Sequence, residues 1–322
     1  MRKVVCLLSF LLVVALAGNA FGWAEWNYAG VNHSWNTAGN WGGAVPTAAD
    51  DPIMRDAGAG GYAEVGPGVN AVGNMMWMYG DGQADLNVNG GNLTLSQLRI
   101  AVDDGVKTVN VSDGGTVNLS SDSTIGQGGT GNLNVTGGSY TNTGWTYVGF
   151  GGTGNIAIGG GGAANFGPLR LWNGSMVSSG TVTVGSDMTV GESGAFDLTM
   201  TGGSLDQTAG WLYVGFGAAG GVHLNGGLLS INSLQLDGSA GEYFDMSGDG
   251  TLKIKDARPE DIAWQINWYA SQGYLTVNGH ESAVGMLDIA TESGTDYTIV
   301  TVIPEPVTML LLGLGGLFIR RK

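Results

Sequence analysis

Three histidines and a few acidic or glycine-rich motifs are the residues of this chain whose types suggest chemistry. His33, His223 and His280 lie far apart in the sequence, each in a different predicted region. A metal triad or a Ser-His-Asp set requires its members to come together in the fold. The spacing therefore predicts surface or core histidines rather than a catalytic or metal site.

Two glycine-rich patterns match ligand-binding motifs only in part. GQGGTGN and GFGGTGN contain G-x-G, but a dinucleotide site needs a strand-to-helix turn and no helical pattern follows. Segments 128–135 (GGTGNLNV) and 151–158 (GGTGNIAI) are close to a calcium-binding nonapeptide, yet Leu133 and Ile156 occupy its aspartate position and cannot ligate calcium. Glycines at chain corners are the favoured interpretation.

Carboxylates also give no strong catalytic signal. Asp50-Asp51 and Asp103-Asp104 are predicted to be solvated turns, with weak cation binding as the alternative. Glycan-cleaving enzymes need an acid/base set lined up on one face, whereas Asp85 and Asp197 are far apart in the repeat pattern described below. We therefore predict no enzyme activity, no catalytic residue, no metal and no cofactor.

Aromatic residues give the more specific signal. GWTYVGF and GWLYVGF place Trp145 with Tyr147, and Trp211 with Tyr213, on the outward face of a strand. The copies lie 66 residues apart, which is near three coils of the repeat or about 14 Å. We hypothesise a glycan-stacking surface; the alternative is that these rings pack on each other or under a loop.

The elements that position these residues follow from an internal repeat. Gly-Gly pairs preceded by a short alternating strand start at 90, 114, 137, about 160, 202 and 226, and a weaker coil at 177–184 bisects the long gap. A longer copy relates 121–140 to 186–205. The unit is therefore about 23 residues long.

This period predicts a parallel β-solenoid, or β-helix, with all-β structure. Alternation points Leu133 and Val135 to one face and Asn134 to the other. One coil cannot bury its apolar row, whereas stacked coils share a continuous core. The alternative, an antiparallel sandwich, has turn signals every 8–12 residues but no long repeat.

Solenoids expose their ends, so caps are expected. The stretch 23–76 lacks the period and holds Trp23, Trp26, Trp35 and Trp41, which suit an N-terminal cap. We predict solenoid coils over 77–255 and a C-terminal cap over 256–303. Pro259-Glu260-Asp261, ahead of Ile262, Ile266 and Tyr269, predicts a short helix there, and 296–302 predicts a final strand.

Charge excludes nucleic acid as a partner. The chain has 12 Lys+Arg against 27 Asp+Glu and a formal net charge of −15, and such a surface repels polyanions. Sixty glycines accompany 43% hydrophobic residues and ten tryptophans, a composition that favours a folded body over disorder.

The N-terminus has the layout of a secretory signal peptide. Arg2 and Lys3 precede an apolar run over 4–17, and small residues near 18–22 offer cleavage sites. An uncleaved anchor is the alternative. The only cysteine, Cys6, lies within this segment 1–22, so the mature protein is predicted to have no disulfides.

The C-terminus has three parts in a fixed order. Pro304-Glu305-Pro306 precede an apolar stretch over 307–319 and the basic end Arg320-Arg321-Lys322. Segment 304–322 resembles a PEP-CTERM sorting signal, a resemblance that covers about 20 residues. It implies recognition by exosortase, a membrane protease-transpeptidase, with cleavage near the PEP motif. More loosely, segment 35–51 and the coils resemble autotransporter-associated β-strand repeat proteins.

The physics of the tail agrees with a transient hold in the membrane. Thirteen helical residues span about 20 Å, less than the roughly 30 Å of a hydrocarbon core, and terminal cations favour the cytoplasmic side. A plain tail anchor is the alternative. We therefore expect an exported, non-enzymatic structural or matrix protein of the cell envelope or surface, in contact with extracellular polysaccharide. The alternative function is a surface carbohydrate-binding module.

Overall fold

The structure of the protein is a computed structural model that describes residues 22–27, 32–55, 61–238, 241–255, 259–280 and 283–304. The chain is all-β with one α-helix in the described part, and it forms a parallel β-solenoid of about eight coils, roughly 23 residues apart. This confirms the fold predicted from the repeat. Two compact units, Met1–Pro168 and Leu169–Lys322, are described separately.

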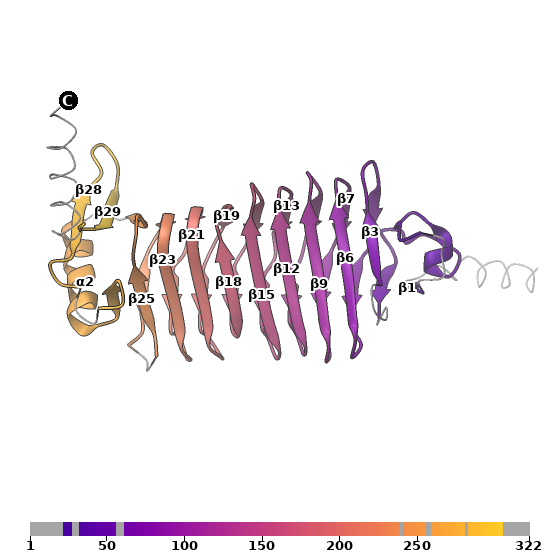
Figure 1. Ribbon diagram of the computed structural model, residues 1–322, viewed down its shortest axis with the longest axis horizontal. Coiled ribbons are helices and arrows are strands. Elements are labelled where there is room, and N and C mark those ends of the chain that lie inside the picture. The colour runs from indigo at the N-terminus through magenta and orange to yellow at the C-terminus, as the bar shows by residue number, and fades with distance from the viewer. Residues whose placement is uncertain are drawn as a thin grey trace, which may run out of the picture. The chain divides into compact units, whose positions relative to one another are not determined.

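In the first unit, each full coil supplies three short strands, and each strand pairs in parallel with its counterpart in the next coil. The strands stack side by side in order along the chain (Figure 1). One row contains β1 (Trp23–Trp26), β2 (Asp51–Met54), β5 (Met75–Met78), β8 (Gln97–Ile100), β11 (Ser123–Ile125) and β14 (Thr146–Val148). The second contains β3 (Tyr62–Val65), β6 (Gln83–Asn89), β9 (Val106–Ser112), β12 (Thr130–Thr136) and β15 (Thr153–Gly159). The third contains β4 (Asn70–Val72), β7 (Asn92–Leu95), β10 (Thr116–Leu119), β13 (Ser139–Asn142) and β16 (Ala163–Phe166).

Alternation along each strand builds the core. Leu133 and Val135 of β12 are fully buried, while Asn134 between them is half-buried on the other face. In register with Leu133, neighbouring coils place Val109 and Ile156. Apolar side chains therefore stack in continuous columns, as the sequence pattern predicts.

The two glycines of a corner pair meet different requirements. Gly114 has φ +79°, a conformation that residues with a Cβ rarely adopt. Gly115 has no such φ, but a Cβ there would lie closer than 3.0 Å to the backbone carbonyls of Val88 and Ser112. The first glycine allows the turn, and the second allows the coil to approach the coil before it.

A tryptophan cluster closes the N-terminal end of the first unit. Trp26, Trp35 and Trp41 are buried, and the ring of Trp41 lies 4.8 Å from Trp26 and 4.6 Å from Trp35, edge to face. The 3-10 helix η2 (Ala38–Trp41) presents Trp41, whose Nε1 donates to Trp35 O at 2.7 Å. Trp23 does not join them, contrary to expectation, and is 75% exposed. It lies three positions from Trp26 in β1 and so faces the other side of the strand.

Some strands before residue 77, where the sequence analysis places the start of the coils, also pair in parallel. Strands β2 and β5 pair with each other, and β3 and β4 pair with the next coil.

In the second unit, β17 (Leu169–Leu171), β20 (Met188–Val190), β22 (Leu212–Val214) and β24 (Leu234–Leu236) form one parallel row. The other strands are β18 (Gly174–Ser178), β19 (Thr181–Val184), β21 (Phe196–Gln207), β23 (Gly220–Ile231), β25 (Tyr243–Met246) and β26 (Thr251–Lys255). The long β21 pairs with β18 along its first half and with β19 along its second. A single strand, β21, therefore runs through the corner that separates β18 from β19 in the preceding coil.

The last coil carries a different set of elements. Helix α2 (Pro259–Gln272) and the strands β27 (Leu275–Val277), β28 (Leu287–Thr291) and β29 (Tyr297–Val302) follow β26 (Figure 1). Ile262, Ile266 and Tyr269 of α2 are buried, as the sequence pattern indicates. Strand β29 pairs antiparallel with both β26 and β28. This change of direction ends the parallel stacking.

Candidate functional site

The first predicted aromatic copy forms a strip of three rings in the first unit. Trp145 stacks on Tyr147 at 6.1 Å with planes 16° apart, and Tyr147 meets Phe150 edge to face at 5.9 Å. Strand β14 carries Tyr147 outward between the buried Thr146 and Val148. The carboxylate of Asp122, one coil earlier, accepts a hydrogen bond from Trp145 N at 2.9 Å and fixes the start of the strip.

The second copy repeats this geometry in the second unit. Trp211 stacks on Tyr213 at 6.1 Å and 26°, and Tyr213 lies 5.3 Å from Phe216. Asp187 accepts from Trp211 N at 2.9 Å, as Asp122 does from Trp145 N. The repeated Ser-Asp pairs at 121–122 and 186–187 therefore anchor the two strips in the same way.

Sequence reasoning missed the third ring of each strip. Phe150 and Phe216 are 45% and 49% exposed, and Trp211 is 43% exposed. Each phenylalanine is the last residue of the repeated hexapeptide, so the repeat itself carried the signal. The two strips belong to different units, and their spacing of about three coils stays a prediction.

The second unit contains a polar cluster that the sequence did not indicate. The Tyr243 hydroxyl lies 2.9 Å from Asp197 Oδ1 and 2.7 Å from His223 Nε2. Asp197 is two coils before Tyr243, and the residue between them in register is Gly221. A Cβ on Gly221 would lie 2.5 Å from the Tyr243 hydroxyl. Glycine here opens the path by which Tyr243 reaches across a coil.

The chemistry of this cluster favours a structural tie. Burial first, and then the Asp197 carboxylate, raise the pKa of Tyr243 to about 12. The phenol therefore keeps its proton at physiological pH and donates it in a hydrogen bond instead of acting as a base.

The other sequence-predicted positions lie apart from one another or inside the core. His33 stacks on Tyr62 at 4.0 Å, and His280 is exposed. Leu133 and Ile156, at the calcium-motif positions, are buried. Within the described ranges, no three His, Cys, Asp or Glu side chains are grouped as a metal ion would require.

The acidic pairs take up turns. Asp50 accepts from the backbone N and hydroxyl of Thr47 at 2.8 and 2.7 Å, and these hydrogen bonds lower the pKa of Asp50. Asp51 and Asp103 instead lie at the edge of a cleft, described next.

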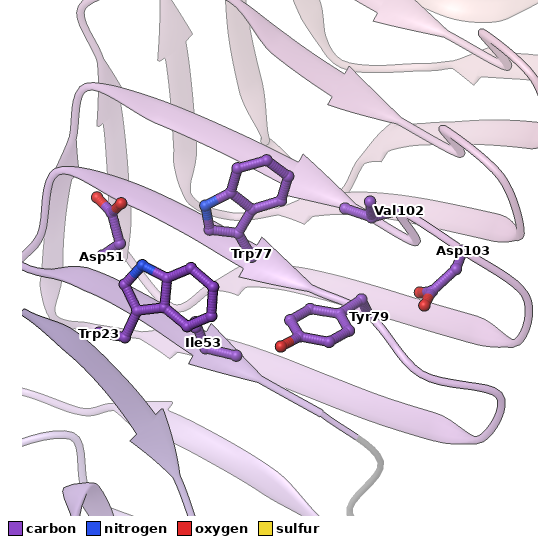
Figure 2. A pocket seen from close by; sticks show the side chains of 7 residues that line it. All are labelled: Trp23, Asp51, Ile53, Trp77, Tyr79, Val102 and Asp103. Carbon is purple, nitrogen blue, oxygen red and sulfur yellow. The ribbon is translucent and has the colours of Figure 1, made fainter.

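A cleft of about 320 Å³ opens on the β1–β2–β5–β8 row of the first unit, at positions that the sequence analysis did not combine. Figure 2 shows its three aromatic rings, those of Trp23, Trp77 and Tyr79, with Asp51 and Asp103 toward opposite ends. The seven residues that line it are Trp23, Asp51, Ile53, Trp77, Tyr79, Val102 and Asp103.

The predicted sorting signal lies almost wholly outside the described residues. Pro304 is the last residue that the structure describes; Glu305, Pro306, Arg320, Arg321 and Lys322 fall beyond it, as does the signal peptide up to residue 21. The helices in the described part include none with the length and apolar character needed to span a bilayer.

Comparison with protein-family models, with curated proteins and with solved structures finds no match to this chain.

Proposed function

We propose that this chain is an exported, non-enzymatic structural protein of the cell envelope or extracellular matrix. The observation that carries the proposal is that outward polar side chains are joined coil to coil. Asn110 Nδ2 donates to Asn87 Oδ1 at 2.9 Å, and Asn134 Nδ2 donates to Asn110 Oδ1 at 2.9 Å. These side chains extend the backbone pairing into a ladder.

A second ladder runs beside the first. Asn155 Nδ2 donates to Asn132 Oδ1 at 3.0 Å, and Asn132 Nδ2 donates to Thr108 Oγ1 at 3.4 Å. Along these two outward columns, amide and hydroxyl side chains are hydrogen-bonded to their counterparts in the next coil. Such a face supports a role as a scaffold.

Sequence features at the two ends support export and sorting. The signal-peptide layout of 1–22 directs the chain across the inner membrane, and the 304–322 segment resembles the PEP-CTERM signal. An exosortase-like transpeptidase is the partner that this resemblance implies. The acidic body suits an extracellular polysaccharide matrix and not a nucleic acid.

Mass spectrometry of the chain recovered from an exosortase-bearing host tests the sorting step. We expect a C-terminus near Pro304-Glu305-Pro306, and retention of the full tail in a Glu305→Ala variant. A wild-type chain that still ends at Lys322 would rule out processing. Cell fractionation of the same cultures tests export, since a cytosolic chain contradicts the proposal.

The exposed aromatic strips favour carbohydrate binding as a second candidate function. Stacked rings with an exposed edge ring suit the apolar faces of sugars, and each unit carries one such strip. Tryptophan fluorescence during glycan titration tests it. We expect Trp145→Ala and Trp211→Ala each to weaken binding, while Trp264→Ala, which removes an exposed tryptophan of α2, leaves it unchanged. Unchanged affinity in the first two variants excludes these strips.

A further inference from the structure

We propose that the cleft of Figure 2 binds a neutral glycan built of gluco-configured pyranose rings. This site is made of other residues than the aromatic strips and does not depend on them. Its volume of about 320 Å³ is at the low end for small-molecule sites, which suits a short stretch of a glycan chain.

Three rings form the apolar surface of the cleft. Trp23 comes from β1, Trp77 from β5 and Tyr79 from the residue that follows β5. Parallel pairing of β1 with β2, and of β2 with β5, brings these rings together from separate coils. Ile53 of β2 lies among them and is only 2% exposed. The C–H faces of all-equatorial pyranoses are flat and apolar, so they complement such a surface.

Two arginines hold the rings in place. The Arg55 guanidinium lies 4.4 Å from the centre of the Tyr79 ring and also pairs with Glu25 at 2.8 Å. Arg99 lies 5.2 Å from the Trp77 ring. These cation–π contacts engage one side of each ring and fix its orientation. Pre-oriented rings lose little freedom when a sugar binds.

The two carboxylates are also pre-oriented. Met75 N donates to Asp51 Oδ1 at 3.1 Å, and Gly80 N donates to Asp103 Oδ1 at 2.8 Å. Within the described part of the chain, the Oδ2 atoms of Asp51 and Asp103 accept no hydrogen bond. Carboxylate oxygens accept hydrogen bonds from sugar hydroxyls, and their position beside the rings places acceptors at the rim of a stacked pyranose.

A buried lysine supports the Asp103 end of the cleft. Lys107 is fully buried, and its Nζ donates to the carbonyl oxygens of Gly80 and Gly82. The Gly80 carbonyl therefore accepts a hydrogen bond from Lys107, and the Gly80 N–H donates one to Asp103. This pins the turn that follows Tyr79.

Charge decides between glycan classes. Near the cleft, Arg55 is paired with Glu25 and Arg99 offsets part of the negative charge of Asp51 and Asp103. Together with the net charge of −15 on the chain, the two carboxylates disfavour uronic acids, whose own carboxylates would be brought close. A neutral chain has hydroxyls to donate and no charge to repel. The expected order is therefore neutral glucan well ahead of polyuronate.

Isothermal titration of the purified full chain with cellohexaose, laminarihexaose and hexagalacturonate tests the proposal. We expect at least one neutral hexasaccharide to bind and hexagalacturonate to bind at least tenfold more weakly. Trp23→Ala and Trp77→Ala should each lower the affinity about tenfold, and Asp103→Asn several-fold. Trp264→Ala is the matched control and should stay within twofold.

Trp23 is highly exposed and Asp103 lies on an exposed turn, so their variants report on binding even if Trp77→Ala disturbs folding. Unchanged affinity in Trp23→Ala and Asp103→Asn overturns the cleft assignment, as does a preference for hexagalacturonate or no binding of either neutral glycan. Loss of binding only in a Trp145→Ala/Trp211→Ala variant overturns the cleft and supports the strips. The proposed function as an exported structural protein is tested separately, by the mass of the C-terminus and by cell fractionation.

Discussion

Single residues without side chains set how closely the coils approach. Gly115 lies where any Cβ would collide with the backbone of the preceding coil, whereas the exposed Gly39 in η2 has nothing within 4 Å of its Cβ position. Substituting each of these two glycines distinguishes the effect of a steric overlap from the effect of simply losing a glycine.

Gly115→Ala is expected to lower the free energy of unfolding by about 1–3 kcal/mol, because the coil must shift to relieve the overlap. Gly39→Ala should change it by less than about 0.5 kcal/mol. Urea denaturation followed by circular dichroism measures both. Equal midpoints for the two variants would contradict the close-approach account.

Tyr243 is the residue whose titration reports on the cross-coil tie. Its pKa is raised to about 12 from the ordinary value near 10. A group with a raised folded-state pKa contributes stability that is complete below its unfolded pKa and is lost as pH rises through the folded one. The contribution of Tyr243 should therefore be complete below about pH 10 and disappear through about pH 12.

Ultraviolet titration of tyrosinate measures this shift. Tyr243→Phe should remove one tyrosine that ionises near pH 12, and Asp197→Asn should lower the pKa of Tyr243 because the carboxylate raises it. A titration curve that is the same for the wild type and Asp197→Asn would show that the hydrogen bond does not form.

At the scale of elements, two neighbouring coils of the first unit share a buried polar network. Asn142 at the end of β13 donates to Ser123 Oγ in β11 at 2.9 Å and to Thr146 Oγ1 in β14 at 2.7 Å. The buried Tyr140 hydroxyl donates to Ser123 Oγ at 3.2 Å. In register with Asn142, Leu119 and Phe166 occupy the neighbouring coils. This network joins β13 of the third row to β11 and β14 of the first row, inside an otherwise apolar column.

The network should show coupling between its members. Asn142→Leu is expected to cost about 1–3 kcal/mol, because Ser123 and Thr146 each lose one buried hydrogen bond. A double-mutant cycle with Thr146→Val should give a coupling energy of about 1 kcal/mol or more. Urea denaturation of the four proteins supplies the cycle, and additive effects would argue against a shared network.

Sequence patterns predicted the regular elements but missed the contacts between residues that lie far apart in the chain. Alternation at 132–136 indicated that Leu133 and Val135 point inward, because the period of a strand is local. Asn142 occupies an inward position although its side chain is polar. Its partners are 19 residues back and 4 residues ahead, so whether they meet depends on the geometry of the corners. The cleft was missed for the same reason, since Trp23 and Trp77 come together only when coils stack.

For the whole molecule, charge is the dominant feature. With 27 acidic and 12 basic residues, repulsion among carboxylates opposes the compact state. The close pair of Lys253 and Glu292, 2.6 Å apart, involves one of these few cations. The composition alone predicts this net repulsion, because it depends on the number of charged residues and not on where they lie.

Raising NaCl from about 10 mM to about 300 mM should raise the melting temperature, because the screening length falls from about 30 Å to well under 10 Å. The gain should level off at higher salt once repulsion is screened. Differential scanning calorimetry at pH 7 measures it. A melting temperature that falls over this range would contradict a balance dominated by repulsion.

The matched registers of β9, β12 and β15 restrict how this architecture can change in length. All seven residues of β12 pair one to one with both neighbours. Losing a single residue inside such a strand would turn its apolar row outward, whereas gaining or losing one complete coil leaves every row in phase. Length changes inside these strands are therefore restricted to whole coils, and the similar blocks at 121–140 and 186–205 are what the gain of complete coils would leave behind.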